Sequence, residues 1–195
     1  GWDNINTNGS ARQVTINGQN HSLKLSSHYL WLTASTGTNT TGWHITFENF
    51  ANIQAANKTY GLLGIDTNDP GKNSVEFKNV TINASSPITS SQANYNVTLT
   101  GNNTINGTLT GNNAVAYAHD LEISGTTTAD HLSSDKSTTG ATIFSVSGNA
   151  TIDSGAKLII NSSAKNVAGI KFSTPGQLTV QPNANVSITL GDGQS

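Results

Sequence analysis

The chain of 195 residues contains no cysteine and no methionine, and Arg12 is its one arginine. Without cysteine, neither a disulfide nor a thiolate metal site can form. Charged residues make up only 10% of the chain, and the lysines are scattered. Because a nucleic-acid-binding protein needs a basic face, we expect no nucleic-acid partner. No apolar run reaches the roughly 20 residues of a membrane-spanning helix, so we expect no membrane insertion.

Asn, Thr, Ser and Gly take the place of the missing charges. The hydrophobic fraction is 34% and the net charge is -2. Disordered chains usually combine high net charge with few β-branched residues, whereas this chain is rich in Val, Ile and Thr. The composition predicts a folded, β-rich, monomeric domain over residues 1–195, with a neutral polar surface. We expect this domain to be a fragment of a longer protein.

Short alternating segments recur along the whole chain. Each has apolar residues at its first and third places, and most have Gly or Asn at the fifth. The segments are VTING, ITFEN, VEFKN, VTLTG, LEISG, FSVSG and LTVQP, which start at Val14, Ile45, Val75, Val97, Leu121, Phe144 and Leu178. Their starts lie 22 to 34 residues apart. Self-similarity at this period indicates a solenoid, since a four-stranded propeller blade needs about 40 residues or more.

The sequence therefore predicts an all-β fold, a right-handed single-stranded parallel β-helix of about seven coils. In each coil the first- and third-place residues point inward and stack on those of the next coil, about 4.8 Å away. Gly and Asn at the fifth place suit a bend, because they most easily adopt positive φ. The rival is a β-sandwich of hairpins, since Asn17-Gly18 and Asn106-Gly107 suit type I′ turns. Hairpins do not require the recurring fifth-place turn residue, so we favour the β-helix.

The first two coils are long, and their additional residues, 26–44 and 54–73, are expected to form loops on one face. Such insertions often form the binding face of a solenoid. We predict that Tyr29, Trp31, Trp43 and Tyr60 stack on sugar rings while His44 hydrogen-bonds to hydroxyl groups, because Tyr and Trp offer a flat apolar face with a polar group. The alternative is that these rings pack in the core, and we expect one of Tyr29 and Trp31 to be buried.

The segment DTNDPGKN, which starts at Asp66, is a further candidate for ligand contact. Asp66, Asn68 and Asp69 give it the composition of a calcium loop, since hard cations prefer carboxylate and amide oxygens. It lacks the D-x-D-x-D-G spacing and the later Glu of such a loop. Asp-Pro-Gly is strong turn chemistry, so we favour a plain turn and predict no metal ion or other cofactor.

The segment YAHD contains the last group of candidate binding residues, Tyr117, His119 and Asp120. It places a histidine beside an acid and an aromatic ring. His is the side chain that ordinarily titrates between pH 5 and 8, so this group could make binding depend on pH. The alternative is an ordinary polar surface.

We predict that the chain is not an enzyme and has no catalytic residues. A glycoside hydrolase needs carboxylates that converge on one face, and the acids of this chain are spread along it. Glu48 and Glu76 are expected to lie close together on neighbouring coils, which is the nearest approach to such a pair. Arg12 has no acidic partner nearby in sequence.

The units FKNVTIN, VTLTGNNTI and FSVSGNATIDSGAKLII resemble the pectate-lyase-like β-solenoid regions of large Gram-positive surface adhesins, especially those of lactobacilli. The resemblance covers nearly the whole chain. It implies an extracellular module, anchored to the bacterial cell wall through regions outside this chain, that binds host or plant polysaccharides, glycoproteins or extracellular matrix proteins. No binding motif transfers residue by residue. The alternatives are a structural spacer and a polysaccharide lyase or hydrolase of the same fold.

Overall fold

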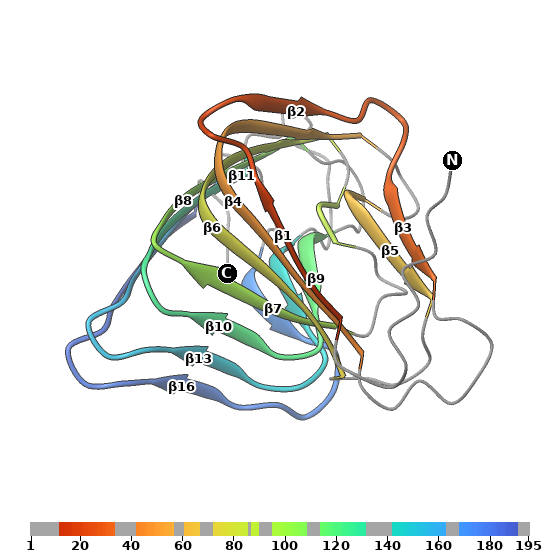
Figure 1. Cartoon of the computed structure of the whole chain (residues 1–195). Coiled ribbons are helices and arrows are strands. Elements are labelled where there is room, and N and C mark those ends of the chain that lie inside the picture. The colour runs from red at the N-terminus through yellow and green to blue at the C-terminus, as the bar shows by residue number, and fades with distance from the viewer. Residues whose placement is uncertain are drawn as a thin grey trace.

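The computed structural model describes residues 12–33, 42–56, 61–66, 72–85, 87–89, 95–108, 114–131, 142–162 and 168–190. The regular secondary structure of these ranges is entirely β-strand. Every ladder between the named strands is parallel. The predicted parallel β-helix is therefore confirmed, and the sandwich of hairpins is wrong. Figure 1 shows the strands stacked as successive coils.

The strands are short, apart from β4 and β6, which each turn a corner of the coil. Their bounds are β1 Arg12–Asn17, β2 Ser22–Lys24, β3 Leu30–Thr33, β4 Trp43–Ala55, β5 Leu63–Asp66, β6 Asn73–Ala84, β7 Tyr95–Thr100, β8 Asn102–Gly107, β9 Ala114–Ala118, β10 Leu121–Ile123, β11 Thr126–His131, β12 Thr142–Val146, β13 Ala150–Ile152, β14 Lys157–Ser162, β15 Ala168–Phe172, β16 Leu178–Val180 and β17 Asn185–Leu190.

The coils have three faces. Face one stacks β1, the first parts of β4 and β6, then β7, β10, β13 and β16. Face two stacks β2, the last parts of β4 and β6, then β8, β11, β14 and β17. Face three consists of the pair β3–β5 and the sheet β9–β12–β15. A bridge between Leu63 and Thr89 connects them, together with two hydrogen bonds in which the Thr89 hydroxyl donates to the Tyr117 carbonyl and accepts from the Tyr117 N–H.

Faces one and two have seven stacked levels, whereas five turns carry a named strand on all three faces. This is a small difference from the predicted seven coils. In the turn of β6, the described part of face three has only the bridge between Thr89 and Leu63, and the described residues of the last turn end with β17. The insertions at residues 26–44 and 54–73 each contribute a strand of face three, β3 or β5. The prediction that these residues form loops throughout is therefore wrong.

The inward side chains of face one form two columns. One column is Val14, Ile45, Val75, Val97, Leu121, Ala150 and Leu178, and the other is Ile16, Phe47, Phe77, Leu99, Ile123, Ile152 and Val180. In both columns all side chains between those of β1 and those of β16 are buried. Phe47 and Phe77 stack with ring centroids 5.7 Å apart and planes 16° apart. Each fully buried large side chain contributes about 1.5–3 kcal/mol, so the two columns contribute strongly to stability.

One repeat unit belongs to a different face from the one the sequence predicts. Phe144 and Val146 lie in β12 on face three, where they pair with Ala116 and Ala118. The residues that continue face one are Ala150 and Ile152. The alternation of apolar and polar residues is the same on every face of a solenoid, so it identifies a strand without identifying its face.

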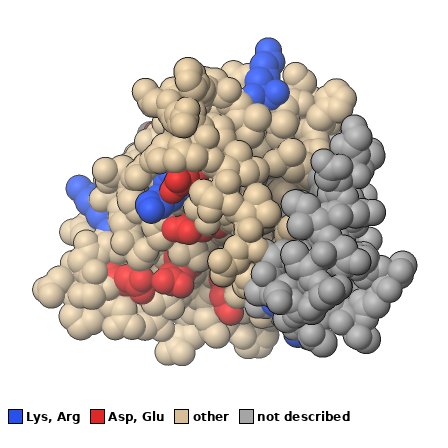
Figure 2. All heavy atoms as spheres, viewed as in Figure 1, with Lys and Arg blue, Asp and Glu red and all other residues tan. Residues whose placement is uncertain are grey.

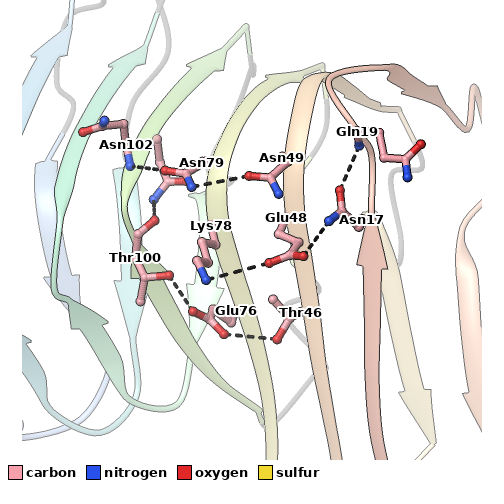
Figure 3. Close-up of polar contacts among 11 residues, drawn as sticks. Asn17, Gln19, Thr46, Glu48, Asn49, Glu76, Lys78, Asn79, Thr100 and Asn102 are labelled. Atoms are coloured by element: carbon pink, nitrogen blue, oxygen red, sulfur yellow. Dashed lines mark hydrogen bonds and ion pairs between the residues drawn. The ribbon is translucent and has the colours of Figure 1, made fainter.

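Positive-φ residues mark the corner between faces one and two in three successive coils. Asn49, Asn79 and Gly101 have φ of 56°, 54° and 68°, which confirms the predicted bends there. Gly18 and Gly125 do not have positive φ. The Asn79 side chain donates to Asn49 Oδ1 over 3.4 Å and accepts a bond from the Asn102 N–H over 3.0 Å (Figure 3). These amide bonds connect the coils at the corner.

Candidate functional site

The outward side of face one carries two rows of polar side chains that run across the coils. Row A is Gln13, His44, Ser74, Asn96, Asp120 and Asn149. Row B is Thr15, Thr46, Glu76, Thr98, Glu122 and Thr151. Strand geometry produces these rows, because residues beside an inward position face solvent and repeat about every 4.8 Å from coil to coil.

Both rows line a groove on face one. It consists of two depressions, of about 400 Å³ and about 420 Å³. Ser74 and Thr98 line both depressions, so the groove continues from β1 to β13. Its described lining includes Glu76, Asp120 and Glu122 but no Lys or Arg, and Figure 2 shows acidic side chains gathered on this face. The groove therefore combines hydroxyl and amide groups with negative charge.

Hydrogen bonds along row A hold its side chains in place. His44 Nδ1 lies 2.6 Å from Ser74 Oγ. Asn96 Oδ1 accepts a bond from the Asp120 N–H over 3.2 Å, and Asp120 Oδ1 accepts one from the Asn149 N–H over 2.7 Å. The side of the groove formed by row A is therefore held in place without a ligand.

In row B, Glu76 is held between two threonines. Thr46 Oγ1 donates to one carboxylate oxygen over 3.1 Å, and Thr100 Oγ1 donates to the other over 2.5 Å (Figure 3). Glu48 lies opposite Lys78 rather than opposite Glu76, and its carboxylate is 3.8 Å from the Lys78 amine. The prediction that Glu48 and Glu76 are neighbours on successive coils is therefore wrong. Glu48 follows the second inward residue of its coil, whereas Glu76 follows the first.

A different set of carboxyl groups lies together at the far end of row B. Partial burial raises the pKa of Glu122 above its ordinary value, and the charge of Asp153, a hydrogen bond with Asp153 and the charge of Glu76 add to this effect. Carboxylate oxygens accept hydrogen bonds, and the Asn149 amide and Thr151 hydroxyl that line the same end can donate them. This end of the groove can therefore both donate to and accept from a hydroxyl group.

The raised pKa of Glu122 predicts how the stability of the fold depends on pH. The folded protein binds this proton more tightly than the unfolded chain does, so stability is lost as pH rises from about 4.3 through the folded pKa. We expect Glu122→Gln to be more stable than the wild type at pH 7 and to lose this advantage at pH 4. Urea unfolding at both pH values measures it, with Glu48→Gln as the control. An equal pH response of the two variants would contradict the prediction.

The N-terminal part of the chain is similar to a known protein family. Residues 1–90 match a family model described as "Putative pectate lyase-like adhesive domain". This match covers just under half of the chain and runs from the N-terminus to β6, which includes His44, Ser74 and Glu76 of the groove. No curated protein and no solved structure matched the chain. The match supports the resemblance to pectate-lyase-like adhesive solenoids, and the description presents the family as adhesive rather than catalytic.

The aromatic residues predicted to stack on sugar rings do not form an exposed platform together. Trp43 is 4% exposed and lies in the core cluster, so the prediction that its ring faces a ligand is wrong. It alternates with His44 at the start of β4, and the inward position takes the larger apolar ring. Tyr29 is half-buried just before β3. Trp31 lies in β3, but its side chain is outside the described part of the structure.

The second cluster of candidates is largely outside the described residues. This applies to Tyr60, Asn68 and Asp69. Asp66 is the last residue of β5, and its side chain is not described. The role of this acidic segment stays a prediction.

The YAHD segment is divided between two faces. Tyr117 lies on face three in β9, and its hydroxyl accepts a bond from the Ala114 N–H over 3.1 Å. His119 Nδ1 lies 3.2 Å from Ser147 Oγ, while Asp120 lines the groove on face one. Among the candidates whose side chains the structure describes, Asp120 and His44 are thus the two that lie in one groove.

Most groove residues were missed by sequence reasoning. Ser74, Asn96, Thr98, Glu122 and Asn149 belong to residue types that recur throughout the chain. The available signal was their place in the repeat, directly before or after the first inward residue. In the described part of the chain, no three His, Asp or Glu side chains are grouped to hold a metal ion. The same residues include no helix that is long and apolar enough to cross a bilayer.

Proposed function

We propose that the chain is an adhesive module of a cell-surface protein, and that the groove on face one binds an extended glycan. The observation that carries this proposal is the continuity of the groove over the coils from β1 to β13. Rows A and B repeat hydroxyl, amide and carboxylate groups at about 4.8 Å intervals. A linear polymer can make the same kind of contact at each coil, so its affinity adds up from many shallow contacts.

The charge of the groove favours a neutral glycan over a polyuronate. Glu76, Asp120 and Glu122 line it without a described Lys or Arg. Like charges brought together at an interface cost several kcal/mol, so the carboxylates of a polyuronate would be repelled. The hydroxyl groups of a neutral sugar instead find both donors and acceptors along the two rows. The groove lacks aromatic side chains among its described lining residues, so recognition rests on hydrogen bonds rather than on ring stacking.

The partner we propose lies outside the cell that carries the protein. Neutral, hydroxyl-rich chains occur among host and plant polysaccharides and on glycoproteins, including those of the extracellular matrix. The adhesive description of the family matched by residues 1–90 supports an extracellular location on the cell surface. A spacer function would leave the groove without a ligand, and the experiment below separates the two functions.

Thr98→Tyr is expected to block the groove. Thr98 lines both depressions, and tyrosine keeps a high strand propensity while filling the space above β7. We expect at least a tenfold loss of affinity, about 1.4 kcal/mol, for the neutral oligosaccharide that binds best on a glycan array. Calorimetric titration measures it, and Thr104→Tyr is the matched control because Thr104 faces outward on β8 of face two.

Oligogalacturonate serves as the anionic ligand in the same titration. We expect it to bind more weakly than the neutral oligosaccharide at neutral pH. Absence of binding by every glycan would favour the spacer function. Binding that Thr98→Tyr and Thr104→Tyr reduce equally would place the ligand elsewhere than the groove.

A further inference from the structure

The two rows of the groove on face one alternate in chemistry from coil to coil. Between β4 and β13, row B changes between a threonine and a glutamate at each coil, in the order Thr46, Glu76, Thr98, Glu122 and Thr151. Row A changes in step with it, between a side chain that contains nitrogen and one whose polar atoms are all oxygen, in the order His44, Ser74, Asn96, Asp120 and Asn149. These coils therefore repeat their chemistry at every second coil.

The alternation defines two kinds of coil. On β4, β7 and β13 an imidazole or amide of row A accompanies a threonine hydroxyl, and on β6 and β10 a serine or aspartate accompanies a glutamate. The neighbouring strands β1 and β16 both carry a threonine in row B, Thr15 and Thr179, so the alternation spans the five coils of β4, β6, β7, β10 and β13. An ionised carboxylate only accepts hydrogen bonds, whereas a threonine hydroxyl donates and accepts. A ligand that runs across the coils thus meets an acceptor-only side chain of row B at every second coil.

The spacing of the rows suits one sugar ring on each coil. Neighbouring coils are about 4.8 Å apart, and the two rows are separated by two residues along each strand, about 6.6 Å. The residue between the rows points inward and is buried at all five coils, as Ile45, Val75, Val97, Leu121 and Ala150. The floor between the rows is therefore backbone, and a flat ring can lie on it with one edge toward each row.

The carboxylate of Glu76 is already fixed in the groove. The hydroxyl groups of Thr46 and Thr100 each donate to a different oxygen of this carboxylate (Figure 3). Each carboxylate oxygen has a second acceptor site, so Glu76 can still accept from a ligand. Glu122 is exposed two coils away. The two glutamates therefore form a pair of acceptors at a spacing of about 9.6 Å, twice the distance between coils.

An extended glycan with β-1,4 linkages has the same two-unit repeat. Successive sugars are turned over by half a turn about the chain axis, and each advances the chain by about the distance between two coils. The edge with the two vicinal hydroxyl groups therefore faces the same side at every second sugar, and the edge with the ring oxygen lies between. A carboxylate can accept hydrogen bonds from both vicinal hydroxyls, and a threonine hydroxyl can donate to a ring oxygen.

We propose that the groove is specific for neutral glycans with β-1,4 linkages, with one sugar on each of the five alternating coils and the vicinal hydroxyls of alternate sugars on Glu76 and Glu122. This inference rests on the proposed function of the groove and adds the linkage that the groove selects. Chains with β-1,3 or α-1,4 linkages coil into helices. They do not return the same edge to one side at every second sugar, so they engage one of the two glutamates at a time.

Calorimetric titration with pentasaccharides of equal length tests the linkage. The β-1,4-linked oligomers of glucose, mannose and xylose are compared with the β-1,3-linked and α-1,4-linked oligomers of glucose. Because one hydrogen-bonded carboxylate is at stake, we expect the best β-1,4-linked ligand to bind at least about tenfold more tightly than the other two linkages. A neutral glycan of another linkage that binds as tightly would overturn this inference and leave the proposed function standing. Absence of binding by every neutral glycan would overturn both.

Moving one glutamate by one coil tests the alternation itself. The double variant Glu76→Thr, Thr98→Glu keeps the composition and charge of row B but places its two carboxylates on neighbouring coils. We expect its affinity for the best β-1,4-linked pentasaccharide to fall about tenfold. Glu122→Thr ends the two-coil repeat without bringing charges together, and we expect a loss of similar size. Thermal unfolding shows that each variant remains folded.

Asp130→Thr is the matched control for Glu122→Thr. It removes the same charge from β11 on face two, where Asp130 accepts a hydrogen bond from Asn161 away from the groove. We expect it to keep the affinity of the wild type and its preference for the β-1,4 linkage. A folded Glu122→Thr variant that binds as tightly as the wild type would overturn the inference. So would equal losses in Glu122→Thr and Asp130→Thr.

Discussion

Truncation of Phe77 to alanine is expected to lower the free energy of unfolding by about 3–5 kcal/mol. Phe77 is 1% exposed and stacks on Phe47 in the coil below it. Its removal loses the buried ring area and leaves a cavity between two rigid coils, which cannot collapse without breaking the ladders of β6 with β4 and β7. A loss of this size is a large share of the stability of an ordinary domain.

Urea unfolding followed by circular dichroism measures this effect. Val180→Ala is the matched control, because Val180 occupies the same column as Phe77 but is 49% exposed. We expect the control to cost less than about 1 kcal/mol. Phe77→Leu keeps most of the apolar volume and is expected to lie between the two. Similar losses for Phe77→Ala and Val180→Ala would show that the columns are not the source of stability.

Replacement of Gly42 by alanine is also expected to lower the free energy of unfolding strongly. Gly42 has φ of 67°, and a Cβ atom there would lie 2.0 Å from the backbone oxygen of Lys72 in the next coil. The left-handed conformation alone costs a non-glycine residue about 1–2 kcal/mol. The contact with Lys72 is with backbone, so relief requires the two coils to separate. We therefore expect a total loss of at least about 2 kcal/mol.

Gly155→Ala separates the two causes. Gly155 has φ of 74°, but a Cβ atom there would have no neighbour within 4 Å. It is expected to cost about 1 kcal/mol, the conformational penalty alone. The difference between the two variants in the free energy of unfolding then reports the contact between coils. An equal loss in both variants would show that the backbone beside Gly42 moves away freely.

The fold was largely predictable from local pattern. Alternating apolar residues at a period of 22 to 34 residues allow a stack of short parallel strands and few other folds. Asn49, Asn79 and Gly101 were recognisable as bends because few residue types adopt positive φ. The pattern failed at Phe144, which lies on face three, since a strand of any face shows the same alternation.

The candidate site was much less predictable. Trp43 and His44 are adjacent in sequence, yet one is in the core and the other lines the groove. The aromatic ring was the more conspicuous candidate, but burial of its apolar area decided its direction. Asp120 was found through the neighbouring histidine, and its actual partners are Asn96 and Asn149 of the adjoining coils.

By itself, the sequence determined that this protein is a parallel β-solenoid with a polar, nearly uncharged surface, because alternation and bend residues act over a few neighbouring positions. Only the tertiary structure decided that Glu76, Thr98 and Glu122 lie in one row and that Phe144 lies on face three. Both outcomes depend on the register between coils. That register depends on the length of every bend between residues 12 and 190, and local preferences do not specify these lengths. The stacking of inward side chains along the whole rod selects the register.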